Sequence, residues 1–460
     1  MTYKNRGTIY MEETASKNSK ALTVLTEGSI WKCMLSFAFP LFLGNLFQQL
    51  YNTADSLIVG NFLGDDALAA VSSSGSLIFL MVGFFNGIAI GAGVIVARYY
   101  GAKQKQQLSN AIHTLVAFGL VSGVLLMLVG MALTPYILRW MGTPENVLPN
   151  SILYFRIYFS GSIGFVMYNI FMAILQSVGD SKHPLQYLII SSFINIALDL
   201  LFIAVFGLGV GSAAAATVIS QIVSALLSFF LLLKAPEEYR ISIKKIRFDS
   251  AMLKQLLSYG LPAGLQNSII SIANVVVQSN INAFGSSAMA GCGAYSKIEG
   301  FVFLPITCFN QALTTFIGQN IGAQKLERVK KGAKFGILCS IAIAELIGVI
   351  LYLFAPFLVS LFVEAEEVIH FGVLQARTVS LFYFLLALSH CMAGIFRGAG
   401  KSLVPMLVML AFWCILRITY ITTIMHFVNV ITAVFWAYPL TWSLSSLVFL
   451  IYYFKAKWME

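Results

Sequence analysis

The sequence predicts an all-α integral membrane protein with twelve transmembrane helices in two related six-helix bundles. Three observations support this fold class: the composition, the length of the apolar segments and an internal repeat. Of the 460 residues, 58% are hydrophobic and only 10% are charged, whereas a soluble domain carries about 25% charged residues. Because so few charges cannot cover a water-facing surface, lipid is the expected solvent.

Apolar segments long enough to cross a bilayer, which takes about 20 residues, recur along the whole chain. Several exceed that length, which predicts tilted or kinked helices. Pro40 in the first span and Pro262 in the seventh are the candidate kink positions. The predicted spans are 31–60, 67–97, 109–133, 151–176, 184–206, 210–233, 255–284, 287–318, 334–356, 373–396, 403–427 and 430–454.

Lysine and arginine are concentrated in alternate connecting segments. With the N-terminus placed inside, 24 of the 29 basic residues lie on the cytoplasmic side, and only Arg139 lies near an external loop. The positive-inside rule therefore predicts a multi-pass protein of the plasma (inner) membrane with both termini in the cytoplasm. This topology accounts for the net charge of +10, so we expect the lipid bilayer as a partner and no nucleic acid.

Three motifs recur about 221 residues later in the chain. Because six helices per half bring both halves into the membrane from the same side, the repeat predicts a pseudo-two-fold axis along the membrane normal. The matching pairs are Leu35–Pro40 with Leu257–Pro262, Arg98–Lys103 with Gln319–Gln324, and Ile174–Leu185 with Ile395–Met406.

The repeat also predicts the domain organisation. Two lobes of six spans each are joined by a basic linker and flanked by short polar ends. The expected parts are a cytoplasmic N-terminal segment (1–30), the N-lobe (31–233), a basic cytoplasmic linker (234–254), the C-lobe (255–454) and a cytoplasmic C-terminus (455–460).

Known catalytic and metal-binding patterns are missing from the sequence. The six cysteines form no CxxC pair, and the five histidines form no HExxH motif. There is no GxxxxGK[ST] sequence for ATP binding. We therefore expect no enzyme activity, no catalytic residue and no cofactor.

Ionisable side chains at membrane depth are costly and are candidates for function. For Arg156, Glu345, Arg377 and Arg417 we favour packing or interfacial roles. The full set within the predicted spans is Asp55, Arg156, Asp199, Lys297, Glu299, Glu345, Arg377 and Arg417.

The two aspartates of the first half have polar neighbours at helical spacing. Asp55 shares a helix face with Tyr51 and Gln48. Asp199 lies one turn after Asn195, and a short connection brings Thr217 of the next span towards the same point. Oxygen ligands of this kind suit a proton or a hard cation such as sodium. The alternatives are a solvated interfacial carboxylate for Asp55 and a cap or interface residue for Asp199.

The repeat serves as an internal control for these acids. The positions equivalent to Asp55, Asn195, Asp199 and Thr217 carry no acid: they are Val277, Leu416, Tyr420 and Tyr438. A requirement of the fold should appear in both halves, so the asymmetry favours function. Binding of a cation is then predicted to bend the first helix at Pro40 and Gly44, as a two-state element.

The second half carries its own polar candidates. Lys297 and Glu299 are two residues apart and so do not face each other on a helix. One hypothesis is a polar patch for substrate in the C-lobe, and the alternative is a pair of inter-helix contacts that fix packing. The patch would comprise Asn267, Asn274, Gln278, Tyr295, Lys297 and Glu299.

Several motifs together resemble the multidrug and toxic compound extrusion (MATE) transporters of the MOP flippase superfamily. Within that family the sequence is similar to the branch of the DNA-damage-inducible protein F type. The motifs are Pro40 with Gln48–Asp55, Gly60–Gly64, Gln176–Asp180, Asn195–Asp199 and Gly318–Ala323.

The resemblance implies export of cationic, amphipathic organic compounds against inward movement of protons or sodium, by a monomer. It implies a coupling site, for a proton or a sodium ion, at Asp55, Asn195, Asp199 and Thr217. It also implies a cavity lined by Gln48, Tyr51, Tyr154 and Asn169. Another branch has an acid in the seventh span, and that acid is missing here. The alternative is a flippase for lipid-linked or polysaccharide precursors, which would favour a more cationic cavity.

Overall fold

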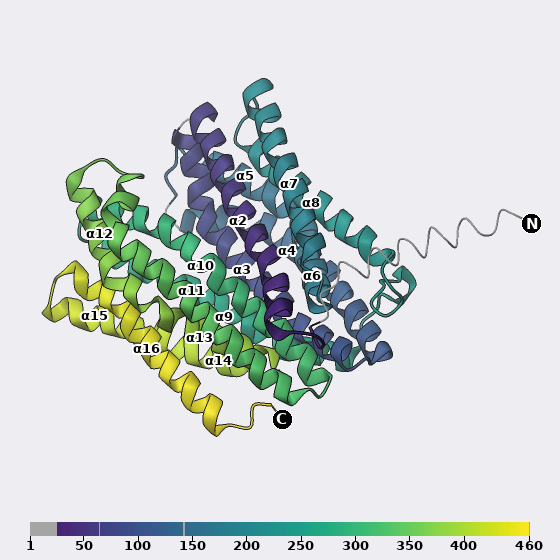
Figure 1. The fold of residues 1–460 in the computed structure, drawn as a ribbon. Coiled ribbons are helices and arrows are strands. Elements are labelled where there is room, and N and C mark those ends of the chain that lie inside the picture. The colour runs from purple at the N-terminus through teal and green to yellow at the C-terminus, as the bar shows by residue number, and fades with distance from the viewer. Residues whose placement is uncertain (1–24, 64, 141–142, 460) are drawn as a thin grey trace, which may run out of the picture. The chain divides into compact units, whose positions relative to one another are not determined.

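The computed structural model describes residues 25–63, 65–140 and 143–459, with side chains throughout except at 65, 66, 68–70, 72–80 and 82. These ranges are helical and contain no strand, which confirms the all-α class (Figure 1). Most of the predicted N-terminal segment 1–30 lies outside the described residues.

Every predicted span coincides with one helix or with consecutive helical pieces. The elements are α2 (Ile30–Leu63), α3 (Asp65–Gly101), α4 (Lys105–Trp140), α5 (Leu148–Ser160), α6 (Ser162–Ser177), α7 (Lys182–Asp199), η1 (Leu200–Val205), α8 (Gly211–Leu233), η2 (Ile243–Lys245), α9 (Ser250–Asn282), α10 (Ser286–Gly322), α11 (Leu326–Ser360), α12 (Glu366–Val379), η3 (Ser380–Phe382), α13 (Tyr383–Gly398), α14 (Leu403–Met409), η4 (Leu410–Leu416), α15 (Arg417–Phe427) and α16 (Ile431–Lys455).

Ten helical segments within the described residues are long and apolar enough to cross a membrane, and eleven if the bent pair α5–α6 is one span. The 37-residue helix α3 is outside this count. The number twelve therefore stays a prediction. Large apolar side chains are exposed along these helices, for example Leu125 (56%) and Leu353 (62%), as expected of surfaces that face lipid.

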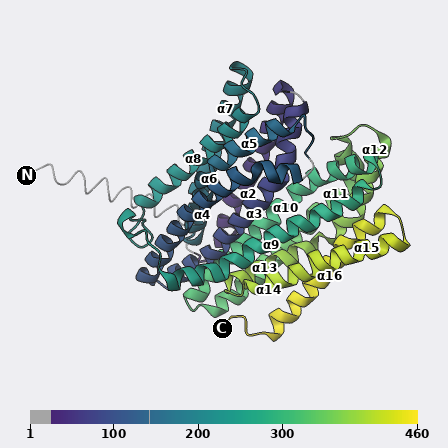
Figure 2. The ribbon, with the colours of Figure 1, turned by 180° about the vertical axis from the view of Figure 1, so that it is seen from behind.

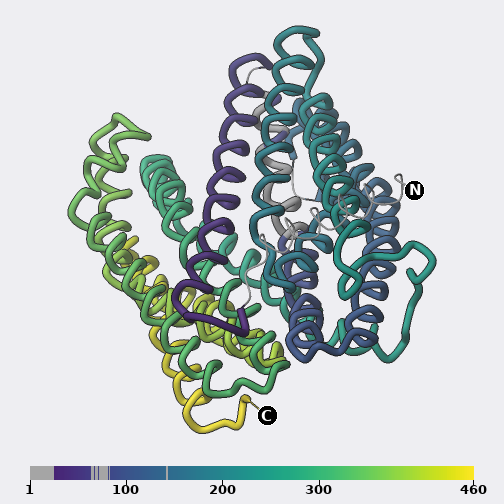
Figure 3. The backbone as a smooth tube through the Cα atoms, turned by 45° about the vertical axis from the view of Figure 1, so that its right-hand side comes forward, coloured from purple at the N-terminus to yellow at the C-terminus, as the bar shows by residue number. Residues whose placement is uncertain are grey.

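The chain forms two compact units, and two helices are divided between them. Phe39–Leu257 belongs to unit 1, whereas Leu25–Ala38 and the chain from Ser258 onwards belong to unit 2. Helix α2, which runs as one continuous rod (Figure 3), thus begins in unit 2 and continues in unit 1. Helix α9 shows the reverse division at Leu257, so the first turns of each half pack with the other half's unit.

The internal repeat is visible in the backbone. Lys103 (φ 56°) and Gln324 (φ 57°), 221 positions apart, are the two non-glycine residues with positive φ among the described residues. Gly179 (φ 93°) and Gly400 (φ 82°) form a second pair at the same spacing. Left-handed residues of this kind end helices by satisfying their last carbonyl groups. The two halves therefore share local structure as well as sequence.

The predicted span 151–176 is not one continuous helix, because it breaks at Gly161. Helices α5 and α6 are bent by 49° at this residue. A Cβ atom on Gly161 would lie 2.4 Å from Cγ1 of Val218 on α8, so the close approach requires glycine. The second half is interrupted at the equivalent place, where the 3₁₀ turn η3 ends at Phe382.

Unit 1 is held together by the contacts of α4, α6 and α8, which lie side by side in Figures 1 and 2. In unit 2, α10 packs against α11, α12 and α13. The α10–α12 contact depends on two glycines. A Cβ atom on Gly291 would lie 2.2 Å from the carbonyl oxygen of Val368, and one on Gly372 would lie 2.8 Å from that of Gly291. Small residues allow such close backbone packing in membranes.

Candidate functional site

A buried and a half-buried carboxyl group meet inside unit 1. Asp55 of α2 and Asp199 at the end of α7 lie within hydrogen-bonding reach of each other. Asp199 is fully buried, and neither of its oxygens has a donor; Oδ1 of Asp55 also has none. Because ionised carboxylates only accept hydrogen bonds, this pair needs a shared proton or a bound cation to be stabilised.

The local structure at Asp199 is irregular. The helix α7 ends at this residue and continues as the π-helical segment η1. Single π-helical turns are frequent at functional sites in helices. Here the irregularity directly follows the acid at membrane depth. The sequence does not reveal it, because residues 200–206 are as apolar as the rest of the predicted span.

Asn195 and Thr217 join the acid pair. Asn195 lies one turn before Asp199 on α7 and is buried, with no donor to its Oδ1. Its Nδ2 donates to Oγ1 of Thr217 over 3.5 Å, and Thr217 donates in turn to the carbonyl oxygen of Ala213 over 3.1 Å. The structure thus pairs Asp55 with Asp199 and Asn195 with Thr217, and the two pairs are linked through α7, where Asn195 and Asp199 lie one turn apart.

Tyr51 links this cluster to the polar side chains around it. Its hydroxyl lies within hydrogen-bonding reach of Gln48 and Gln221 and within electrostatic range of both acids. Gln221 was not among the site residues predicted from the sequence, although it follows Thr217 by one helical turn on α8. That spacing is the signal that points to it.

Tyr154 and Asn169 differ in their relation to the acids. Tyr154 is 4% exposed and lies within electrostatic range of Asp55 and Asp199. Its ring stacks on that of Tyr158, with centroids 6.5 Å apart. Asn169 instead donates from Nδ2 to the carbonyl oxygen of Phe165 in its own helix over 2.8 Å. Tyr154 therefore belongs to the surroundings of the acid pair, and Asn169 contributes no contact to it.

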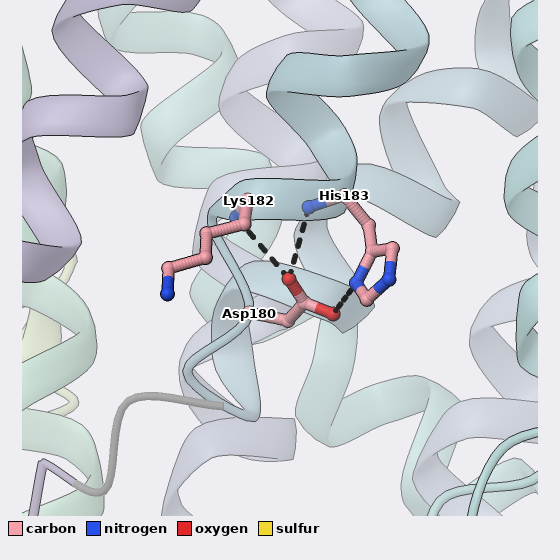
Figure 4. Close-up of polar contacts among 3 residues, drawn as sticks. All are labelled: Asp180, Lys182 and His183. Carbon is pink, nitrogen blue, oxygen red and sulfur yellow. Dashed lines mark hydrogen bonds and ion pairs between the residues drawn. The ribbon is translucent and has the colours of Figure 1, made fainter. Parts of the chain in front are cut away.

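Asp180 holds the start of the helix that carries Asn195 and Asp199. Its Oδ1 accepts hydrogen bonds from the backbone N–H groups of Lys182 (3.2 Å) and His183 (3.1 Å), and its Oδ2 lies 2.6 Å from Nδ1 of His183 (Figure 4). A carboxylate here satisfies helix N–H groups that otherwise have no partner. The sequence motif Gln176–Asp180 is thereby explained as a turn and cap. The equivalent position in the second half is Lys401.

The donor set defines which ions fit. Among the described residues, no three His, Cys, Asp or Glu side chains gather into a group that could hold a metal ion. The cluster instead combines two carboxylates with the neutral oxygens of Asn195 and Thr217. Hard oxygen donors with low total charge suit sodium or a proton, not zinc.

Unit 2 contains a buried network around Arg417. The guanidinium is 1% exposed; its Nη2 donates to Oγ1 of Thr441 (2.9 Å) and its Nη1 to Oδ1 of Asn274 (3.5 Å). The ring of Tyr438 lies 4.7 Å from it, a cation–π contact. Arg417 and Glu299 are within electrostatic range of each other. The packing or interfacial role predicted for Arg417 is compatible with these bonds between helices and stays a prediction.

Glu299 is bound through tyrosine hydroxyl groups. Tyr295 donates to Oε1 of Glu299 over 3.0 Å, and its oxygen is 2.7 Å from the hydroxyl of Tyr383. Lys297 lies elsewhere, with its ammonium group 5.9 Å from the ring centre of Phe362. The structure therefore gathers Tyr295, Glu299 and Asn274 near Arg417, but not Lys297.

Three further predicted positions are separate from both networks. Gln278 donates from Nε2 to Oδ1 of Asn282 within α9 over 2.8 Å. Pro40 is buried inside the continuous helix α2, two residues after the division between the units. Gly44 faces α7, where a Cβ atom would lie 3.5 Å from Leu188. The hinge at Pro40 and Gly44 stays a prediction.

Comparison with known proteins identifies relatives over nearly the whole chain. The MatE family profile matches twice, over residues 40–201 and 262–423, which matches the internal repeat. The probable multidrug resistance protein YoeA of Bacillus subtilis is 32% identical over 434 residues, covering 92% of this chain and 94% of that protein. The probable multidrug resistance protein NorM of Thermotoga maritima is 26% identical over 389 residues, covering 82% of each chain.

Solved structures show the same fold. An outward-facing multidrug resistance MATE family transporter of the MOP superfamily superposes with a TM-score of 0.87 at 24% identity, covering 94% of this chain and 96% of that one. A MOP superfamily transporter from Pyrococcus furiosus gives 0.87 at 23% identity, covering 93% and 96%. The branch of the DNA-damage-inducible protein F type stays a prediction. These relatives do not favour the precursor-flippase alternative. The chain therefore belongs to the MatE family, and it is a multi-pass membrane transporter with the MATE fold rather than an enzyme.

Proposed function

We propose that this transporter is a secondary antiporter that exports cationic and amphipathic organic compounds, driven by inward movement of protons or sodium ions. The observation that carries the proposal is the meeting of Asp55 and Asp199, three of whose four carboxyl oxygens are buried without a donor. Names of relatives such as YoeA support multidrug efflux as the task. We assign coupling to Asp55, Asn195, Asp199 and Thr217 in the N-lobe.

Coupling would follow from the electrostatics of the acid pair. Two adjacent ionised carboxylates inside a membrane are costly. A proton or a sodium ion removes that cost, so the loaded and unloaded forms favour different local structures. Asp55 lies on the same continuous helix as Pro40 and Gly44. We propose that loading changes the bend of α2 there and thereby biases the exchange between two conformations.

Substrate contacts are assigned to polar and aromatic side chains of both units, some within the two networks and some, such as Gln278 and Lys297, apart from them. In the N-lobe, Tyr51, Gln48 and Tyr154 surround the acids, so a substrate and the coupling ion would compete for the same carboxylates. The remaining proposed lining residues are Asn169, Asn274, Gln278, Tyr295, Lys297 and Glu299. The distribution of basic residues supports an inner-membrane location with both termini in the cytoplasm. The proposal further includes the two six-span lobes, supported by the internal repeat, and a monomeric state, which the family resemblance implies.

The proposal is tested by efflux from proteoliposomes that contain a fluorescent organic cation. Two gradients are imposed separately, a proton gradient without sodium and a sodium gradient at uniform pH. We expect efflux with at least one of them and loss of that efflux in Asp55→Asn and Asp199→Asn. Efflux that needs neither gradient would remove the antiport mechanism, and wild-type transport by both variants would remove the assigned site.

A further inference from the structure

The basic linker between the halves is pinned to unit 1 at both ends. The backbone N–H of Ser242 donates to Nε2 of His113 on α4 over 2.9 Å, and that of Asp249 donates to Oγ1 of Thr114 over 3.4 Å. Ile241 is buried and donates from its backbone to the carbonyl oxygen of Leu232 over 3.0 Å. Residues 242–249 are therefore held in a fixed place against α4.

A polar cavity of about 220 Å³ lies between this segment and the start of α4. Lys244, Lys245 and Arg247 line it together with a single carboxylate, Asp249. Oδ1 of Asp249 already accepts a hydrogen bond from the backbone of Met252 over 3.0 Å. In the part of the chain that the structure describes, none of the three cations forms an ion pair. The cavity therefore carries an excess of unneutralised positive charge.

The neutral groups of the cavity complete a site for an anion. His113 donates from Nδ1 to the carbonyl oxygen of Ser109 over 2.6 Å and accepts from Ser242 at Nε2, so both nitrogens are occupied in the neutral ring. Ser109 and Asn110 line the same cavity with a hydroxyl and an amide. Such groups donate hydrogen bonds to phosphate oxygens.

An apolar groove of about 470 Å³ lies along α4, α6 and α8, and consecutive residues of the linker line this groove and the polar cavity. The face of α4 that carries His113 and Thr114 continues into the groove through Val116 and Leu120. Ile243 and Ile246 of the linker also line it, while the basic residues between and after them line the polar cavity. The linker thus contributes both the basic residues of the polar cavity and apolar residues of the groove, a combination typical of segments at a membrane surface.

We propose that this combined site binds one anionic phospholipid, with its phosphate among Lys244, Lys245 and Arg247 and an acyl chain in the groove. Basic residues next to a membrane-spanning helix attract anionic headgroups, and buried methylene groups add affinity for the chain. The topology proposed above places the site at the inner leaflet. The proposal does not depend on the antiport mechanism.

The test compares phosphatidylglycerol with phosphatidylcholine of identical acyl chains. Binding of each lipid to the delipidated full-length protein in detergent is measured by native mass spectrometry. We expect the anionic lipid to bind at least about fivefold more tightly, and the triple variant Lys244→Gln, Lys245→Gln, Arg247→Gln to lose this preference. Because all three side chains are exposed at the surface of the fold, the variant should fold.

A matched triple variant, Lys331→Gln, Lys334→Gln, Lys455→Gln, removes the same charge from exposed positions of unit 2 and should keep the preference. An equal loss in both triples, or no loss in either, would overturn the site. Leu120→Trp, on a side chain that is 40% exposed, should fill the groove and weaken both lipids. Unchanged binding in Leu120→Trp, or full displacement of the lipid by free glycerol 3-phosphate, would overturn the role of the groove.

Discussion

The guanidinium of Arg328 donates from Nη1 to the carbonyl oxygen of Gly28 over 2.6 Å. The same side chain also donates to the carbonyl oxygens of Glu27 (2.7 Å) and Leu25 (3.1 Å) and lies 5.4 Å from the ring centre of Phe316. All of these groups belong to unit 2. A cation in the first turn of α11 interacts unfavourably with the helix dipole. The hydrogen bonds to the three carbonyl oxygens therefore stabilise Arg328 at this position. Arg328 fixes the start of α2, the helix that carries Asp55.

Arg328→Gln should lower the thermal midpoint of the purified transporter, because it removes several charge-assisted hydrogen bonds worth about 2 kcal/mol in total. Arg328→Lys should recover only part of the loss, since an ammonium group cannot reproduce the planar fork. The control is Lys325→Gln, which removes one exposed bond to the carbonyl oxygen of Thr26 (2.9 Å) and should have little effect. Equal midpoints for all three variants would show that the start of α2 is not anchored through Arg328.

Gly291→Ala should destabilise unit 2, because its methyl group would meet the backbone of α12 at Val368 and Gly372. Overpacking against a backbone that cannot move aside costs about 1–3 kcal/mol. The matched control lies two residues further along the same helix: a Cβ atom on Gly293 meets nothing within 4 Å. Gly293→Ala should therefore be neutral or slightly stabilising, as alanine favours helix. Thermal melting in detergent distinguishes the two, and a stable Gly291→Ala variant would argue against close α10–α12 packing.

Asp180→Ala should lower stability by about 1–2 kcal/mol, because the first turn of α7 loses its capping group. Asp180→Asn keeps an oxygen acceptor for the N–H groups of Lys182 and His183 and should recover most of the loss. Hydrogen exchange of the amides at the start of α7 is the direct measurement. If the alanine variant exchanged there at the wild-type rate, the cap would have no stabilising role. Efflux should fall with the cap, since α7 positions Asn195 and Asp199.

The sequence predicts the membrane helices well, because their signal is the apolar length that the bilayer demands. It also predicts the cluster in unit 1, because Asp55 and Asp199 are acids in apolar segments with polar neighbours at helical spacing. The sequence does not predict the irregularities of the backbone. The break at Gly161 follows from the approach of Val218, and the π-helical turn after Asp199 occurs in a uniformly apolar stretch. Both depend on tertiary packing.

In unit 2, likewise, the sequence does not show which of the candidate residues contact one another. Glu299 and Arg417 are separated by 118 positions in the sequence, so no local pattern indicates that they face one another. The bond of Tyr295 to Glu299 lies within α10 at helical spacing, whereas its contact with Tyr383 joins α10 to α13. Lys297 is a candidate only because of its charge and its depth in the membrane, and its ammonium group contacts the ring of Phe362 instead. Residue type and depth in the membrane thus indicate candidate residues. Which of these residues come together depends on how the helices pack.

Asp199→Asn should stabilise the fold while it abolishes coupled transport. The asparagine amide can donate to Asp55, and for the unloaded pair this replaces a repulsive contact between two acceptors by a hydrogen bond worth about 1 kcal/mol. Asp180→Asn is the control, since Asp180 is also buried but already has donors to both of its oxygens. It should therefore gain no stability. Thermal midpoints and gradient-driven efflux are measured on the same preparations. The midpoints are compared without sodium and at a pH where the pair is not protonated. A less stable Asp199→Asn protein under these conditions would mean that groups in the fold already compensate the ionised pair, and the acids would then have a structural rather than a coupling role.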